Sequence, residues 1–107
     1  MSVLEANQVD GAAFDTASGR VVLLIADHLD WEDEAGHLNK LQDKINAYLA
    51  FVQNGEIDNL YPEQVIRGVR FDFRFKFPLS EKGKRFLEVV QQTVQPLNIE
   101  LSVEAPQ

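Results

Sequence analysis

The residues best suited to chemistry lie in one stretch of the chain, between Asp27 and His37. It contains both histidines, His28 and His37, and the only tryptophan, Trp31. Carboxylates and imidazoles ligate zinc or iron, so a metal site built from the histidines together with Asp27 and Asp30 is one interpretation. The spacing argues against it, because His28 precedes the expected helix while His37 lies one to two turns inside it, and no HExxH pairing occurs. The sequence therefore predicts no bound metal and no cofactor.

General acid–base catalysis by one of these histidines beside Asp27 or Asp30 is a second interpretation. The structural alternative is that Asp30 caps the helix, because acidic residues before a helix commonly accept from the free N–H groups of its first turn. The chain has no serine-nucleophile elbow, no glycine-rich phosphate loop and no cysteine. We therefore predict that Asp30 is a cap, that His28 and His37 bond backbone or water, and that there is no catalytic residue. Replacing both histidines is then expected to change thermal stability little.

Three basic residues on the clearest strand form the other group of binding candidates: Arg70, Arg74 and Lys76. They alternate with a ladder of apolar residues, which comprises Val69, Phe71, Phe73, Phe75 and Phe77. The basic face suits an anion, an acidic protein or RNA, but the simpler interpretation is the solvated face of a half-exposed sheet. The phenylalanines point the opposite way, so they are predicted to form core rather than a base-stacking platform.

Strands that position these candidates follow from the hydrophobic pattern. Residues 9–14 and 20–26 are predicted to form a hairpin, and the second strand is apolar on both faces, which is typical of a strand inside a sheet. The aromatic strand follows a connection without regular period at 56–63, and a bulge at Gly68 would explain its change of phase. The last strand covers 97–104.

Two amphipathic helices complete the pattern. The longer begins after Asp30 and ends at Asn54-Gly55, with Lys44 on its outer side. Its buried stripe comprises Leu38, Leu41, Ile45, Tyr48, Leu49 and Val52. The shorter helix starts at a Ser80 cap and is stopped by Pro96.

The order β-β-α-β-α-β predicts an α+β fold, a two-layer sandwich with both helices on one face of a roughly four-stranded sheet. One domain spans residues 1–107, and residues 1–8 are expected to include mobile positions. The strand order stays open, because the loop at 56–64 allows a parallel or an antiparallel return. Complementary outward charges nevertheless predict that the last two strands are neighbours.

Composition limits the partners. The net charge is −7 from 10 basic and 17 acidic residues, so phosphate backbones are repelled and nucleic-acid binding is not expected. The longest apolar run is strand-sized, and the N-terminal residues lack the pattern of a signal peptide, so we expect a cytoplasmic protein without a membrane segment. The absence of cysteine fits a reducing compartment.

A longer pattern runs through the first helix and the segment before it. It consists of Asp27-His28-Leu29-Asp30-Trp31, His37-Leu38, Leu41-Gln42, Lys44-Ile45-Asn46, Tyr48-Leu49, Phe51 and Gly55-Glu56. This pattern resembles a family of small bacterial proteins of unknown function, and the similarity extends from the first strand to the last. The resemblance implies a fold and assigns no chemistry to any residue. The sequence thus favours a small non-enzymatic domain that binds a protein partner or itself; the alternative is a small enzyme or metal-binding protein that uses the region from Asp27 to His37.

Overall fold

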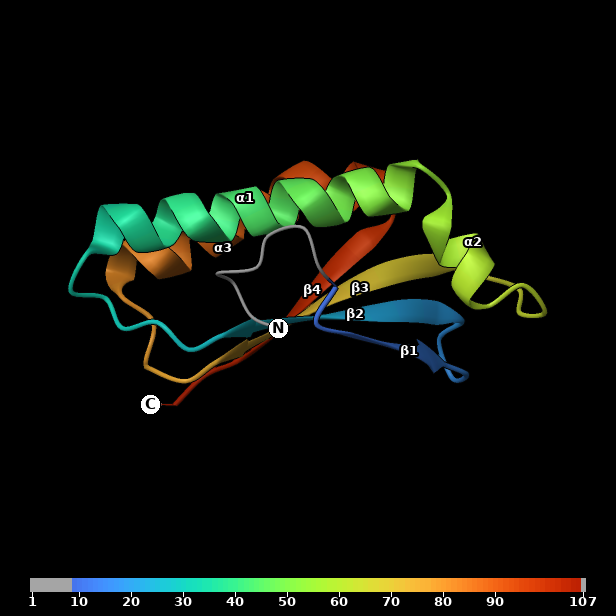
Figure 1. The fold of residues 1–107 in the computed structure, drawn as a ribbon, viewed down its shortest axis with the longest axis horizontal. Coiled ribbons are helices and arrows are strands. Elements are labelled where there is room, and N and C mark those ends of the chain that lie inside the picture. Colours follow the sequence, from blue (N-terminus) through green and yellow to red (C-terminus); the bar gives the residue numbers. More distant parts are fainter. Residues whose placement is uncertain (1–8, 107) are drawn as a thin grey trace.

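The computed structural model describes residues 9–106, so the mobility expected for residues 1–8 lies outside the described part of the chain. Both long helices lie on the same side of one sheet, and the other face of the sheet is open in Figure 1. The elements in order are β1 (Gly11–Asp15), β2 (Arg20–Asp27), α1 (Glu34–Gln53), α2 (Glu56–Leu60), β3 (Gly68–Phe75), α3 (Glu81–Val94), a 3-10 turn η1 (Gln95–Leu97) and β4 (Ile99–Glu104). The predicted α+β fold of two layers is confirmed.

The four strands form one mixed sheet in the order β1-β2-β3-β4. β1 is antiparallel to β2, whereas β2, β3 and β4 run parallel to one another. Successive parallel strands are added in one direction, and right-handed crossovers then place α1 and α3 on the same face. The prediction that the last two strands are neighbours is confirmed.

The core lies between the helices and the inward face of the sheet. Val21, Leu23 and Ile25 of β2 are completely buried, as are Phe71 and Phe73 of β3. The predicted aromatic ladder therefore forms core as far as the end of β3. Burying each large side chain contributes roughly 1.5–3 kcal/mol, so these central strands supply much of the stability.

Two details of the predicted strands are wrong. Phe77 lies beyond the end of β3 and is 36% exposed, so the ladder stops one aromatic residue earlier. No bulge occurs at Gly68, because β3 begins there and pairs in regular register with β2 from its first residue. The residues before Gly68 belong to a connection, so their parity does not constrain the strand.

Each long helix begins with the same local device. Asp33 caps α1 by accepting from Gly36 N at 3.1 Å, and Ser80 caps α3 by accepting from Gly83 N at 3.0 Å. The glycines let the cap approach closely, since a Cβ on Gly36 would lie 2.2 Å from the Asp33 carboxylate. The Ser80 cap is confirmed, but the Asp30 cap is wrong because the helix starts three residues later.

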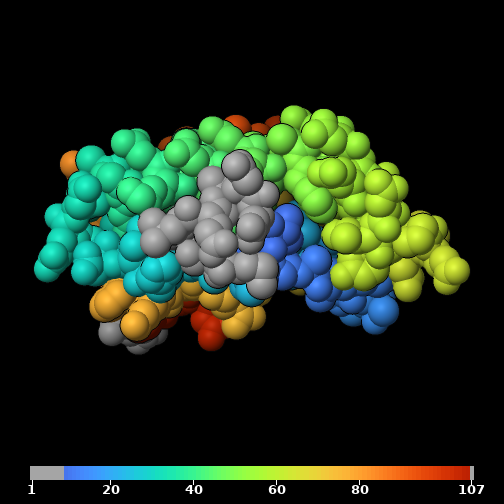
Figure 2. Space-filling view, in the orientation of Figure 1, coloured from blue at the N-terminus to red at the C-terminus, as the bar shows by residue number. Residues whose placement is uncertain are grey.

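The segment predicted as an irregular connection contains the short helix α2, which follows Gly55 in the left-handed conformation at φ 77°. At this end of the molecule the β1–β2 hairpin and the α2 segment lie side by side (Figure 2), and the rings of Phe14 and Tyr61 are 5.7 Å apart. None of the helices within residues 9–106 is long and apolar enough to cross a membrane.

Candidate functional site

Asp27 and His37 form a buried pair at the carboxyl end of β2. His37 Nε2 lies 2.5 Å from Asp27 Oδ2, and His37 Nδ1 lies 2.9 Å from the backbone oxygen of Asp30. The second carboxylate oxygen of Asp27 accepts from Leu29 N at 3.0 Å. The side chain of His37 is 2% exposed and that of Asp27 is 0% exposed, so the pair is shielded from water. It links the end of β2 to the first turns of α1.

The hydrogen-bond pattern determines what the imidazole of His37 can do. A carbonyl oxygen only accepts, so Nδ1 donates to the backbone oxygen of Asp30, and Nε2 is hydrogen-bonded to the Asp27 carboxyl group. Both ring nitrogens are therefore engaged, and the ring has no exposed edge from which to reach a substrate. We expect His37 to be needed for stability, in contrast to the earlier expectation for both histidines.

Trp31 covers this pair and connects the two long helices. Its indole stacks on the His37 ring with centroids 3.8 Å apart and planes inclined by 22°. The edge of its six-membered ring packs against Gly83 at the start of α3, where a Cβ would come within 2.9 Å of Trp31 Cη2. The Trp31 Nε1 atom is buried and has no hydrogen-bond partner within residues 9–106. The tryptophan thus acts as a spacer between the helix starts.

The remaining members of the Asp27–His37 stretch do not join this cluster. His28 is exposed, and the side chain of Asp30 accepts from Glu32 N at 3.1 Å in a local turn. Within residues 9–106 no three His, Asp or Glu side chains are placed to share one metal ion. The structure therefore brings together Asp27, Trp31 and His37 only.

The basic candidates on β3 are already paired with carboxylates on the open face. Arg70 Nε donates to Glu100 Oε1 at 2.5 Å, and Arg74 Nη1 lies 2.6 Å from Glu104 Oε2. The hydrogen bond from Arg70 to Glu100 raises the pKa of Arg70. The hydrogen bond from Arg74 to Asp72 raises the pKa of Arg74. Lys76 follows β3 and is exposed. These arginines therefore hold strands together rather than presenting an anion site.

A buried polar network that the sequence did not indicate lies beside β1. Lys44, expected on the outer side of α1, is 0% exposed, and its Nζ lies 2.9 Å from Asp10 Oδ1. The hydroxyl of Tyr48 accepts from Asp10 N at 2.8 Å and donates to Leu24 O at 2.5 Å. Burial raises the pKa of Tyr48. Only spacing could have indicated that Lys44 is buried, because it falls three residues after Leu41 and four before Tyr48, on the same face of the helix as the apolar stripe.

The edge of β4 is the second feature that sequence reasoning missed. Val69 N donates to Asn98 O at 3.2 Å, and peptide groups alternate in direction, so the N–H groups of Leu101 and Val103 point away from β3. The Leu101 N–H donates to the side-chain Oε1 of Gln91 on α3, at 3.0 Å. An amide side chain thus occupies the place of a neighbouring strand.

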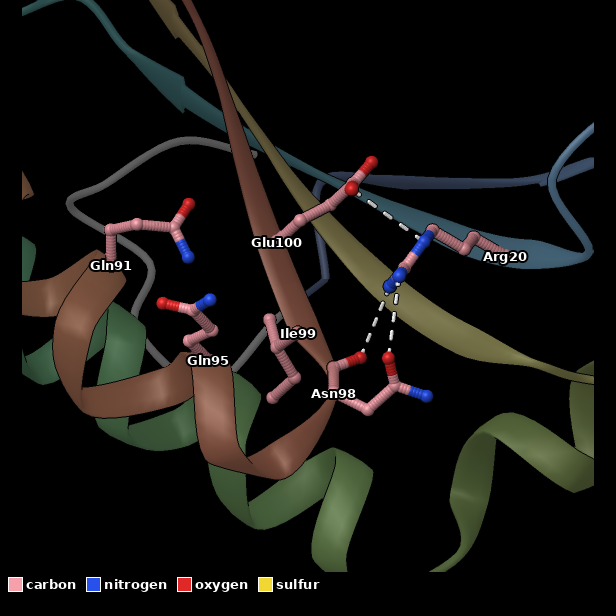
Figure 3. A pocket seen from close by; sticks show the side chains of 6 residues that line it. All are labelled: Arg20, Gln91, Gln95, Asn98, Ile99 and Glu100. Carbon is pink, nitrogen blue, oxygen red and sulfur yellow. Dashed lines mark hydrogen bonds and ion pairs between the residues drawn. The ribbon is translucent and has the colours of Figure 1, made fainter.

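Two hollows flank this contact, and Gln91 lines both. One has a volume of about 540 Å³ (Figure 3) and is lined by Arg20, Gln91, Gln95, Asn98, Ile99 and Glu100. The two glutamines approach β4 from the helix side, whereas Arg20 reaches across from β2 and donates to Asn98 O at 3.1 Å. The other hollow, of about 430 Å³, is lined by Leu87, Glu88, Gln91, Gln92, Leu101 and Val103.

The molecule is thus a two-layer α+β domain with a buried acid–imidazole pair and a strand edge flanked by hollows. Its sequence matches the model of DUF6572, a family of unknown function, over residues 1–107, and the chain belongs to that family. No curated protein and no solved structure matches it.

Proposed function

We propose that the protein is a binding domain that receives an extended segment of another protein along the edge of β4. The observation that carries the proposal is the bond from Leu101 N to the Gln91 side chain. The carboxamide of Gln91 has the same donor and acceptor groups as a peptide bond. Its oxygen lies where the carbonyl oxygen of an added strand would accept the hydrogen bond from Leu101 N. Strand addition to an exposed sheet edge is a common mode of peptide recognition, because main-chain hydrogen bonds supply affinity.

The surroundings of β4 support this role. Val103 is 44% exposed and Leu101 is half-buried, so apolar side chains lie beside the main-chain groups that point away from β3. The hollow between α3 and β4 gives alternate side chains of an added strand a place to lie. A solvated edge with an adjacent groove supplies both parts of such a site.

Charge favours a different protein over a second copy of this chain. Antiparallel pairing of two β4 strands would place Glu100 and Glu104 of both copies on one face of the joined sheet. Carboxylates opposite or diagonal to one another across a strand pair are destabilising. The net charge of −7 also opposes self-association, because two copies of the chain repel each other.

The test is selection of short peptides from a displayed random library, followed by mapping of a selected peptide on the isotope-labelled protein by NMR. An added strand gives the amides of Leu101 and Val103 new acceptors, so their resonances shift and their hydrogen exchange slows. No enriched peptide, or shifts centred on β1 or on the Asp27–His37 pair, would overturn the proposal.

A matched pair of variants at Val103 isolates the main-chain contact. Val103→Pro removes an outward N–H that takes no part in the β3–β4 ladder, and edge strands tolerate proline at such positions. Val103→Ala keeps the N–H. We expect the proline variant to lose peptide binding and the alanine variant to retain it; equal binding by the two would count against strand addition.

A further inference from the structure

We infer that the segment received at β4 alternates basic with apolar residues, an inference that rests on the proposed binding at this edge. The two faces of β4 differ in chemistry. Glu100, Ser102 and Glu104 lie on the open face of the sheet, where they face Arg70, Asp72 and Arg74 of β3. The intervening Leu101 and Val103 lie on the helix side and line the hollow beside α3. Any strand added to β4 meets the same alternation, because its side chains follow the same pleat.

β3 provides an internal example of the neighbour that β4 accepts. It places Arg70 opposite Glu100 and Arg74 opposite Glu104, with ion-pair distances of 2.5 and 2.6 Å. Between them it directs Phe71 toward the helices, where it is completely buried. A partner that alternates in the same way would repeat these pairs on the outer edge of β4.

The two glutamates retain capacity for a further cation. Their side chains are 43% exposed for Glu100 and 71% exposed for Glu104. Glu100 contacts Arg70 and, at 3.6 Å, Arg20, whereas Glu104 contacts Arg74. Each carboxylate has about four lone-pair sites, so these contacts leave sites for another donor. The acidic surface of the whole molecule also steers a basic segment toward this edge.

On the helix side the partner must displace one existing contact. The Gln91 amide that accepts from Leu101 N has to move before a partner carbonyl can take its place. Gln91 is half-buried and lines both hollows, so its side chain can turn toward either one. Gln91 therefore sets the affinity of the edge without itself contributing a specific contact to the partner.

The closing experiment uses two labelled synthetic peptides and fluorescence anisotropy at low ionic strength. In one peptide arginine alternates with valine; in the other glutamate replaces each arginine. We expect the basic peptide to bind at least about tenfold more tightly, which corresponds to about 1.4 kcal/mol. The advantage should shrink as salt is added, because exposed charges are screened. Equal or reversed affinities overturn the inference.

Two variants separate a role in recognition from a role in folding. Glu104→Lys should weaken the basic peptide and strengthen the acidic one, whereas Glu56→Lys on α2 makes the same change in net charge and should leave their ratio closer to wild type. Gln91→Ala should strengthen binding of the basic peptide by roughly two- to tenfold, because the partner then displaces only water from Leu101 N and no longer has to break the intramolecular hydrogen bond. An unchanged ratio in Glu104→Lys, or weaker binding by Gln91→Ala, contradicts the inference.

The outcomes also separate this inference from the proposed function. Library peptides that map to Leu101 and Val103 but lack basic alternation would reject the partner chemistry and leave binding at β4 intact. Absence of any peptide at this edge would reject both. A dimer of the protein that Val103→Pro converts to a monomer would make a second copy the occupant, which overturns the assignment to a basic partner.

Discussion

At two places in the sheet a side chain takes the place of a missing strand, but the two substitutes differ in burial and charge. Beside the start of β1, Asp10 Oδ2 accepts from Ala26 N at 2.9 Å, and its other oxygen pairs with the buried Lys44. At β4 the neutral, half-buried Gln91 makes one hydrogen bond to Leu101 N. The end of β2 beside the start of β1 is closed by a dry ionic network, and the edge of β4 by a single exchangeable amide.

Breaking these two contacts has very different costs in free energy. Separating Asp10 from Lys44 would leave charges in a low-dielectric interior, which is costly. Turning Gln91 away from β4 exchanges one neutral hydrogen bond for bonds to water, which costs little. The Asp10–Lys44 network therefore contributes stability, whereas the Gln91 contact can be exchanged, as the proposed binding at β4 requires. Four predictions test this contrast.

The largest effect is expected from Lys44→Met. The substitution keeps much of the volume but leaves the Asp10 carboxylate buried without the ammonium, at a cost of about 3–5 kcal/mol. Chemical denaturation monitored through Trp31 fluorescence measures the change in the free energy of unfolding. Lys40→Met, on the exposed face of the same helix, is the control and should lie within about 0.5 kcal/mol of wild type. If both variants unfold alike, the β1 side is not closed by its ion pair.

Tyr48→Phe should give the next largest effect. It preserves the ring packed against Phe71 but removes the hydroxyl that links Asp10 N to Leu24 O. Two buried backbone groups then lack their partner, which costs about 1–3 kcal/mol. Because this ring is otherwise retained, a loss below about 0.5 kcal/mol would show that water replaces the hydroxyl and that this side of the sheet is not dry.

The contrast between the two sides also explains what the sequence could predict. Strand alternation and helix spacing depend on neighbours close in sequence, so they predicted the fold class and the Ser80 cap, and the complementary outward charges predicted that the last two strands are neighbours. The contact of Lys44 with Asp10 joins distant segments, and that of Gln91 with Leu101 joins a helix to the next strand; neither residue type is unusual on a helix. The displaced helix start has another cause, since Asp30 and Asp33 are equally suitable caps by residue type, and the close approach at Gly36 favours Asp33.

Gln91→Ala should change stability by less than about 1 kcal/mol, because the edge N–H of Leu101 can bond to water instead. Hydrogen exchange gives a sharper measurement than melting. The Leu101 amide should exchange faster in the variant, while the amide of Ser102, which is directed toward β3, should keep its protection. A loss of several kcal/mol would mean that Gln91 supports the fold as strongly as Lys44 does, and the contrast between the two sides would disappear.

The smallest effect concerns pH at the turn of the β1–β2 hairpin. The hydroxyl of Ser18 donates to Asp15 Oδ2 at 2.9 Å, and this bond, followed by that from Ala17 N, lowers the pKa of Asp15 from its usual 3.8. A depressed pKa in the folded state means that the carboxylate stabilises the fold at pH values above 3.8. That contribution declines as the pH falls below 3.8 toward the lower pKa of the folded state. Asp15→Asn should therefore melt slightly below wild type at neutral pH, and the two melting curves should converge in acid. A difference that persists unchanged at low pH would assign the stabilisation to hydrogen bonds that the asparagine cannot make, and not to the charge of Asp15.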